Sequence, residues 1–325
     1  MLYAARLYAL QNDLLKATRS DPAQSLFIVE SNEPVRSISE RLHSEGFVRD
    51  PDSWRDYLIY SGIDRKIRSG TYLLSHDLTP IEVAAILHDD NPDHVSFAFL
   101  PGWRSEEIAS LLPSSGLNAD KEEFLNIISN PELSSSEFLR AFTSLEGYLY
   151  PDTYQLNRSS SAEEAIESFT RNFFQQLPPE FEAKIAQNHL NLHEAVILAS
   201  IIQKEAVIAE EAPMIAGVFI NRLKAGMPLQ SDPTVQYAIG YSESQSTWWR
   251  NPLAKDDLQV DSPYNTYIYH GLPPAAISNP DLTSLMSVAY PAITPYYYFR
   301  SACDQSGRHI FSTTYEEHLQ AACPP

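Results

Sequence analysis

The sequence contains few cysteines, few basic residues and no long apolar run. Cys303 and Cys323 are the only two cysteines among 325 residues, too few for a disulfide-rich scaffold or a cysteine-based zinc site. No run of 18 apolar residues occurs, so the chain as given contains no predicted membrane span. Lysine and arginine total 23 against 42 acidic residues, a net charge of −19. This balance argues against binding to nucleic-acid phosphates or to anionic lipid.

Patterns typical of metal and cofactor sites are also missing. The nine histidines are scattered singly, without metal-ligand spacing. Glycine totals only 11, and no glycine-rich loop suited to a phosphate is found. The sequence therefore predicts neither a metal nor a cofactor.

Apolar residues make up 43% of the sequence, which is typical of a globular protein. Its length of 325 residues predicts about two domains. Residues 1–25 are expected to form an N-terminal segment, either a short amphipathic helix or a frayed end, or what remains of an anchor. Residues 26–88 read as strand, helix, helix, strand and helix, a small α+β module. A polar, turn-rich stretch follows, and residues 94–325 form the second predicted domain.

The second domain is predicted to be mostly helical with long loops, so the expected fold class is α+β. Helical periodicity dominates from residue 162, with predicted helices at 162–176, 179–187, 193–209 and 211–225. Residues 226–279 are irregular and rich in proline, asparagine and aromatic residues. A long ordered loop of this kind tends to line a binding site, although its aromatic residues could equally pin the loop to the core.

One carboxylate lies on the apolar face of the helix predicted at 193–209. At about 100° per residue, Glu205 falls in the same stripe as Leu198, Ile201 and Ile202. Burial there raises the pKa of a carboxyl group, so Glu205 is a candidate general acid. The alternative interpretation is a buried ion pair in which Arg222 neutralises Glu205.

Further candidates for substrate binding come from the loops and from one short helix. Asp152 and Asp232 can hydrogen-bond a sugar, but both lie next to proline and are equally typical of turns or helix caps. Three adjacent residues supply an amide, a hydroxyl and an aromatic ring, which together could bind a sugar. The alternative is that they only hold their loop in place. These are Asn265, Thr266 and Tyr267. Tyr237 is also a candidate, although a tyrosine there more often belongs to the core.

Several stretches together resemble the YceG-like family of endolytic murein transglycosylases, from about residue 26 onward. Each string is weak by itself, but their order and spacing make chance similarity improbable. The strings are LPGWRSEEIA (100–109), EGYLYPDTYQL (146–156), LASIIQKEA (198–206), VFINRLKAGMPLQSDPTVQYAIG (218–240), SPYNTYIYHGLPPAAISNP (262–280) and AYPAITPYYYFR (289–300).

The resemblance implies cleavage within peptidoglycan glycan strands, between N-acetylmuramic acid and N-acetylglucosamine, with 1,6-anhydro ends as product. The essential glutamate of the family falls on Glu205, and Gln203 stands where many relatives have a second glutamate. The chain departs from the family pattern before Gly102, where the usual acid is missing, and at Ala275, where a glycine is common.

The resemblance also bears on domains, partners and location. It implies that the first module is LysM-like and that cell-wall synthases are further partners. Members of the family are usually tethered to the inner or plasma membrane by one N-terminal helix. An anchor is not evident in this chain. In an oxidising envelope Cys303 and Cys323 could pair. Two alternatives stay open: a non-catalytic glycan-binding scaffold of the synthesis machinery, and an ordinary muramidase, which differs only in product.

Overall fold

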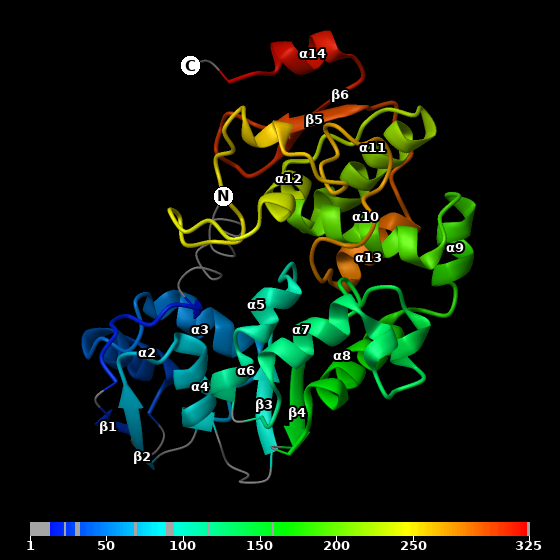
Figure 1. Cartoon of the computed structure of the whole chain (residues 1–325). Helices are drawn as coiled ribbons and strands as arrows, with labels where there is room; N and C mark the ends of the chain where they lie inside the picture. Colours follow the sequence, from blue (N-terminus) through cyan, green and yellow to red (C-terminus); the bar gives the residue numbers. More distant parts are fainter. Residues whose placement is uncertain are drawn as a thin grey trace.

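A computed structural model describes residues 14–22, 24–29, 33–67, 70–88, 94–115, 117–157 and 159–323. Within these ranges the chain is mixed, with many helices and three two-stranded antiparallel sheets. The predicted α+β class is therefore confirmed. Figure 1 shows the N-terminal half of the chain below and the C-terminal half above it. The predicted N-terminal helix falls mainly on residues 1–13, outside the described residues.

The first module has the expected order of elements. Its bounds are β1 Gln24–Val29, α2 Val35–Ser44, α3 Pro51–Tyr60, β2 Gly70–Ser75 and α4 Pro80–His88. Strand β1 pairs with β2 in antiparallel register. The side chain of Asp50 caps α3 by accepting from two backbone N–H groups. The buried Trp54 indole donates to Pro80 O at 2.8 Å, which fixes α3 against α4. The likeness of this module to LysM stays a prediction.

The next elements surround a second two-stranded sheet. They are β3 His94–Ala98, α5 Ser105–Ala109, α6 Leu112–Ser115, α7 Lys121–Ser129, η1 Pro131–Leu133, η2 Leu139–Ala141, β4 Thr153–Asn157 and α8 Ala162–Gln176. Strands β3 and β4 pair antiparallel. Phe97 of β3 stacks on Phe169 of α8 with ring centroids 5.6 Å apart, and this contact seats the helix on the sheet.

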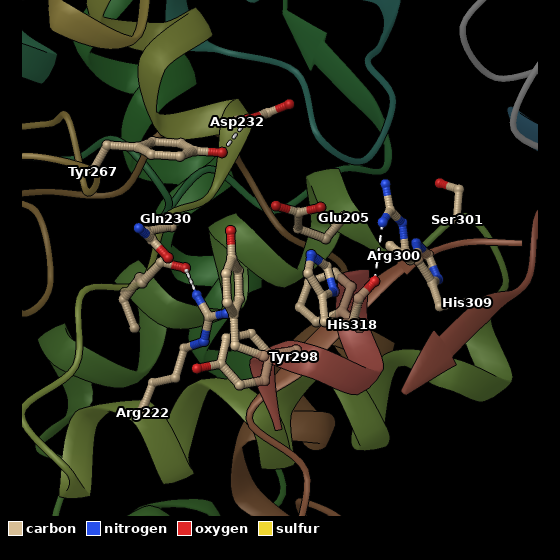
Figure 2. A pocket seen from close by; sticks show the side chains of 13 residues that line it. Glu205, Arg222, Gln230, Asp232, Tyr267, Tyr298, Arg300, Ser301, His309 and His318 are labelled. Atoms are coloured by element: carbon tan, nitrogen blue, oxygen red, sulfur yellow. Dashed lines mark hydrogen bonds between the residues drawn. The ribbon is translucent and has the colours of Figure 1, made fainter. Parts of the chain in front are cut away.

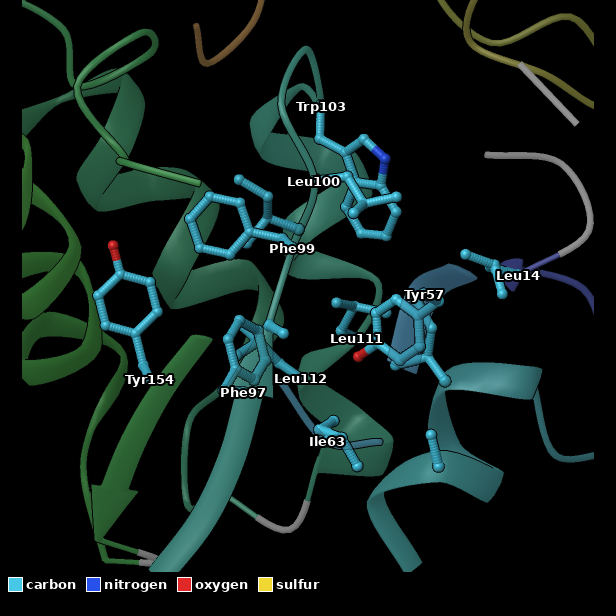
Figure 3. Close-up of a cluster of buried hydrophobic side chains, with 14 of the residues drawn as sticks. Leu14, Tyr57, Ile63, Phe97, Phe99, Leu100, Trp103, Leu111, Leu112 and Tyr154 are labelled. Carbon is cyan, nitrogen blue, oxygen red and sulfur yellow. The ribbon is translucent and has the colours of Figure 1, made fainter. Parts of the chain in front are cut away.

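The first module shares its core with this second group of elements. Figure 3 shows Tyr57 and Ile63 of the module in one buried cluster with Phe97 and Leu112. Leu14, at the start of the described chain, is buried in the same cluster. The predicted boundary between the domains falls mainly on residues 89–93, which lie outside the described residues, so it stays a prediction.

The C-terminal half is built around helix α10. Its elements are α9 Phe181–Gln187, α10 Leu192–Glu205, η3 Ala209–Glu211, α11 Ala212–Lys224, α12 Asp232–Ile239, η4 Asp257–Gln259, α13 Leu282–Ala289, β5 Tyr298–Ser301, β6 His309–Ser312 and α14 Tyr315–Gln320. Helix α10 is capped by Asn191 and packs against α11 and α13 in a second hydrophobic core. Residues from 195 to 202 are all buried, as expected for a central helix.

The prediction of one helix from 193 to 209 is wrong at its C-terminal end. Helix α10 stops at Glu205, and Ala206 leaves it with a ψ of 94°. Residues 206–208 are irregular, the short η3 follows, and a new helix begins at Ala212, with Pro213 in its first turn. Glu205 therefore lies at the C-terminal end of α10, where Ser231 of the segment between α11 and α12 reaches it.

Strands β5 and β6 form an antiparallel hairpin at the C-terminus, and α14 packs on both strands. The structure joins Cys303 to Cys323 by a disulfide, with Cα atoms 5.4 Å apart. This cross-link attaches the tail after α14 to the loop between the two strands. Within the described residues, no helix is both long and apolar enough to cross a bilayer.

Candidate active site

Glu205 is the last residue of α10, and its side chain is half-buried. The adjoining turn of the helix contributes Ile201 and Ile202, both fully buried. Burial raises the pKa of the Glu205 carboxyl to about 7. A carboxyl group with this pKa exists in both protonation states near neutral pH and can give up or take a proton.

A hydroxyl group holds this carboxyl in place. Ser231 Oγ donates to Glu205 Oε1 at 2.5 Å, and this bond partly offsets the effect of burial on the Glu205 pKa. The backbone N–H of Ser231 donates to Thr266 Oγ1 at 3.1 Å, and Thr266 shares a further hydrogen bond with Thr234. Ser231, Thr234 and Thr266 are each buried. The donor to Glu205 therefore sits on a rigid polar network.

The alternative of a buried Arg222–Glu205 ion pair is contradicted. The Arg222 guanidinium donates instead to backbone carbonyls, from Nε to Tyr297 O at 2.6 Å and from Nη1 to Leu229 O at 2.7 Å. Its charge still lowers the Glu205 pKa, but this is the weakest of the four influences on that pKa. In the described part of the chain, no ion pair neutralises Glu205.

Glu205 opens onto a cavity of about 500 Å³ (Figure 2). Its carboxylate lies in the middle of the view, with Asp232 and Tyr267 on one side. The Tyr267 hydroxyl donates to Asp232 Oδ1 at 2.6 Å, and the negative charge of Asp232 raises the pKa of Glu205 further. The volume is in the range of cavities that hold small ligands.

The opposite wall carries basic and imidazole side chains from the C-terminal hairpin and α14. Figure 2 shows Arg300, His309 and His318 across the cavity from Asp232. Arg300 Nη1 donates to His318 O at 3.0 Å, and His309 pairs with Glu211 at 2.8 Å. Burial and the nearby Arg300 lower the pKa of His318, which favours the neutral imidazole at pH 7.

Three of the residues predicted from the sequence meet at this cavity, namely Glu205, Asp232 and Tyr267. Asn265 and Thr266 lie behind it and are fully buried. The Asn265 amide donates to the carbonyls of Leu258 and Val260, so it fastens the loop. These two residues position Tyr267 and Ser231 and do not line the cavity.

The other two predicted residues lie elsewhere. Asp152 is exposed and accepts a hydrogen bond from Asn172 of α8, in the lower half of the molecule. Tyr237 lines a different cavity, where its ring packs on the Arg104 guanidinium at 4.1 Å. The structure does not bring either residue to the cavity around Glu205.

Within the described ranges, no group of three or more His, Cys, Asp or Glu side chains is placed to hold a metal ion. What the cavity does offer is one carboxyl group near pKa 7, a second acid beside it and a basic wall opposite. This arrangement suits proton transfer to and from a bound polar ligand.

The YceG-like family model matches residues 27–323, which is most of the chain. The chain belongs to the YceG-like family. This YceG-like chain is 28% identical to the endolytic murein transglycosylase of Bacillus subtilis (strain 168), over 95% of this chain and 87% of that protein. It is 33% identical to the endolytic murein transglycosylase of Streptococcus pneumoniae D39, over 54% of this chain and 31% of that one.

A solved structure has the same fold. The crystal structure of a YceG-like protein from Listeria monocytogenes superimposes with a TM-score of 0.61 at 27% sequence identity. The match covers 92% of this chain and 99% of that chain. The fold described above is therefore that of a YceG-like protein over nearly its full length.

Sequence reasoning missed Ser231 and the basic wall of this YceG-like cavity. Ser231 directly precedes the predicted Asp232, and a serine before Asp-Pro reads as an ordinary turn residue. Tyr298 and Arg300 are two positions apart on β5, so they share a face of the hairpin. This two-residue spacing is the sequence signal that could have predicted their common wall. Gln203 faces α13, where its Oε1 accepts from Asp281 N and Ser284 Oγ.

Proposed function

We propose that this chain is an endolytic lytic transglycosylase that cleaves peptidoglycan glycan strands between N-acetylmuramic acid and N-acetylglucosamine. The observation that carries the proposal is a half-buried carboxyl group, Glu205, with a pKa of about 7, no ion-pair partner in the described chain, and an open cavity before it. The relatives named endolytic murein transglycosylase support the substrate.

Glu205 acts first as an acid and then as a base. Protonated Glu205 donates its proton to the glycosidic oxygen, the bond from C1 of the muramic acid to that oxygen breaks, and N-acetylglucosamine leaves with a free hydroxyl. The Glu205 carboxylate then takes the proton of the C6 hydroxyl, whose oxygen bonds to C1 and closes a 1,6-anhydro ring. No water is consumed, and Glu205 ends protonated as it began.

This scheme needs only one carboxyl group in contact with the reacting bond. The usual glycosidase pair includes a nucleophile or base opposite the acid. The cavity does hold a second carboxylate, Asp232, but the scheme uses it only through the effect of its charge on the Glu205 pKa. The acetamido group of the substrate itself can stabilise C1 while the positive charge develops. Asp232 keeps the Glu205 pKa high, and Ser231 fixes the direction of the carboxyl.

The deciding experiment is incubation of purified glycan strands with the protein, followed by mass analysis of the ends. Anhydro ends support the proposal, reducing ends would identify a muramidase, and intact strands would identify a glycan-binding scaffold. We expect Glu205→Gln to abolish cleavage while the protein stays folded. The matched control is Glu210→Gln, an exposed glutamate five positions further on. Retained cleavage in Glu205→Gln would overturn the assignment.

The proposal extends to the first module and to location. A LysM-like unit at residues 26–88 would bind the glycan strand next to the cleavage site. The Cys303–Cys323 disulfide suits an oxidising, extracytoplasmic compartment. We place the protein in the cell envelope, with any attachment to the membrane through one N-terminal helix and with cell-wall synthases as further partners. Hydrogen exchange of the intact Glu205→Gln protein with and without purified strands tests the module: protection within residues 26–88 supports this role, and its absence contradicts it.

A further inference from the structure

A second cavity, of about 520 Å³, lies apart from Glu205 and shares none of its lining residues with the first cavity. Helices α5 and α7 and residues 143–146 contribute one side, and Tyr237 of α12 with Tyr264 contributes the other. In Figure 1, α5 and α7 lie at the top of the lower half, facing the upper half. The cavity is therefore formed where the two halves of the molecule meet.

The lining consists of carboxyls, hydroxyls and aromatic rings. Glu106 and Glu146 supply carboxyl groups, four serine and threonine side chains supply hydroxyls, and no lysine or arginine is among the lining residues that the structure describes. Glu106 already has a partner, since Arg104 donates to both of its oxygens. Glu146 has no ion-pair partner within the described residues, although its side chain is 5% exposed.

Two buried groups in this cavity still have capacity for a donor. The oxygens of Glu146 accept from the backbone N–H of Ser105 and from the Asn279 amide, which leaves lone pairs unused. The Ser105 hydroxyl lies close enough to lower the pKa of Glu146, yet it makes no hydrogen bond of good geometry, and the residue is only 2% exposed. A buried hydroxyl without a partner is unfavourable, and a ligand would satisfy it.

We propose that this second cavity binds a primary ammonium group, namely the free side-chain amine of the diamino acid in a peptidoglycan stem peptide. An ammonium group has three donors and no acceptor, which matches the acceptors of Glu146 and Ser105. The Tyr237 ring already packs on the Arg104 guanidinium at 4.1 Å, so the attraction for the ammonium group comes from the Glu146 carboxylate and not from that ring. This inference rests on the proposed function and names the part of the substrate that the second cavity would recognise.

The consequence is a preference for strands that have not been cross-linked. Cross-linking acylates the side-chain amine, which removes its charge and leaves an amide with one N–H. A cavity that requires an ammonium group would therefore accept peptides of new strands and reject those already joined to a neighbour. The second cavity would distinguish a free side-chain amine from an acylated one, while Glu205 acts on the glycosidic bond.

Burial also links this binding to pH. Burial and the neighbouring Glu106 charge raise the pKa of Glu146 well above its usual range, which favours the protonated form near neutral pH. The charged groups near it are Arg104 and Glu106 of α5, while Tyr237 and Tyr264 have pKa values raised above 10 and stay neutral. An ammonium ligand favours the ionised form of Glu146, so binding should release a proton at pH 7 and tighten as the pH rises toward 8.

The test uses two probes that differ only at the amine. One is a stem tripeptide with a free diamino acid at its third position, and the other is the same peptide acetylated on that side-chain amine. We expect the intact protein to bind the free amine about tenfold more tightly, by calorimetry, as for a hydrogen-bonded charge. Equal affinity for the two probes, or binding of neither, overturns the inference.

Variants test which residues are responsible. Glu146→Gln and Ser105→Ala should each remove most of the preference for the free amine, whereas Glu132→Gln, an exposed change of the same kind, should keep it. A preference that survives in both Glu146→Gln and Ser105→Ala overturns the inference. Circular dichroism shows whether each variant is folded, and Ser105→Ala removes a hydroxyl group while keeping the Glu146 carboxyl.

A separate measurement distinguishes this inference from the proposed function. Wild-type protein is given glycan strands from which the peptides have been removed. Cleavage of these strands supports the proposed function whatever the peptide probes show. If they are cleaved while strands with free and acetylated amines react at equal rates, the inference fails and the proposed function stands.

Discussion

Ser231 Oγ donates a hydrogen bond to Oε1 of Glu205 across 2.5 Å, joining the start of α12 to the end of α10. The bond sets both the direction and the acidity of the carboxyl group. Burial raises the Glu205 pKa, Asp232 adds to the rise, and Ser231 and Arg222 oppose it. The resulting pKa of about 7 is a balance that single substitutions can move in either direction.

Removing the Ser231 hydroxyl should raise the pKa of Glu205. Cleavage requires protonated Glu205, so the wild-type rate should fall as the pH rises through about 7. In Ser231→Ala the fall should occur about one pH unit higher, since a hydrogen bond to a charged group is lost. Ser301→Ala, a serine of the same cavity, is the control. Identical pH profiles for Ser231→Ala and wild type would contradict this role.

Neutralising Asp232 should have the opposite effect. Its charge raises the Glu205 pKa, so Asp232→Asn should move the alkaline fall in rate to lower pH. Asparagine can still start α12 and accept from the Tyr267 hydroxyl, so the local structure should persist. The pH dependence of kcat/KM measures the shift. A displacement toward higher pH would show that the charge of Asp232 does not act on Glu205.

Glu205→Gln should stabilise the fold at alkaline pH. The Glu205 pKa is about 7 in the folded state against 4.5 as the ordinary value, so wild-type stability falls as the pH rises from about 4.5 to 7. Above pH 7 the folded wild type carries a half-buried charge, at a cost of about 3 kcal/mol. Denaturant unfolding at pH 5 and pH 8 should show a gain for the variant that is larger at pH 8. The gain should be absent in Glu210→Gln.

Breaking the disulfide should weaken substrate binding. The Cys303–Cys323 bond holds the tail behind α14, and α14 carries His318 and Tyr315 of the cavity wall. The paired change Cys303→Ser with Cys323→Ser should raise KM more than it lowers kcat, and should cost about 3 kcal/mol of stability. A reductant should reproduce the effect in wild type and do nothing further to the variant. An unchanged KM would show that the wall does not depend on the cross-link.

Gly217→Ala should destabilise the protein and disturb the same wall. A Cβ at this position would lie 2.4 Å from Ala292 O, in the segment that leads into β5. Either α11 or that segment must move, at a cost of about 1–3 kcal/mol. Thermal unfolding measures the loss. Lys224→Ala, an exposed change in the same helix, should stay within about 0.5 kcal/mol of wild type.

The sequence by itself determined the local elements and one catalytic candidate. The order of strands and helices in the first module follows from caps, turn residues and alternating apolar residues, all of which act over a few positions. The stripe of Ile201, Ile202 and Glu205 has the same origin, because side-chain direction repeats with the period of the helix. These features depend only on neighbouring residues.

Tertiary structure decided the surroundings of that candidate. Arg222 was a plausible partner for Glu205, but the carbonyls of Tyr297 and Leu229 take its donors. Asn265 and Thr266 had the right chemistry for a glycan, but the fold turns them inward. The basic wall of the cavity comes from a hairpin and a helix nearly a hundred residues beyond Glu205. Periodicity cannot report such contacts, because they depend on how separate elements pack and not on the spacing within any one of them.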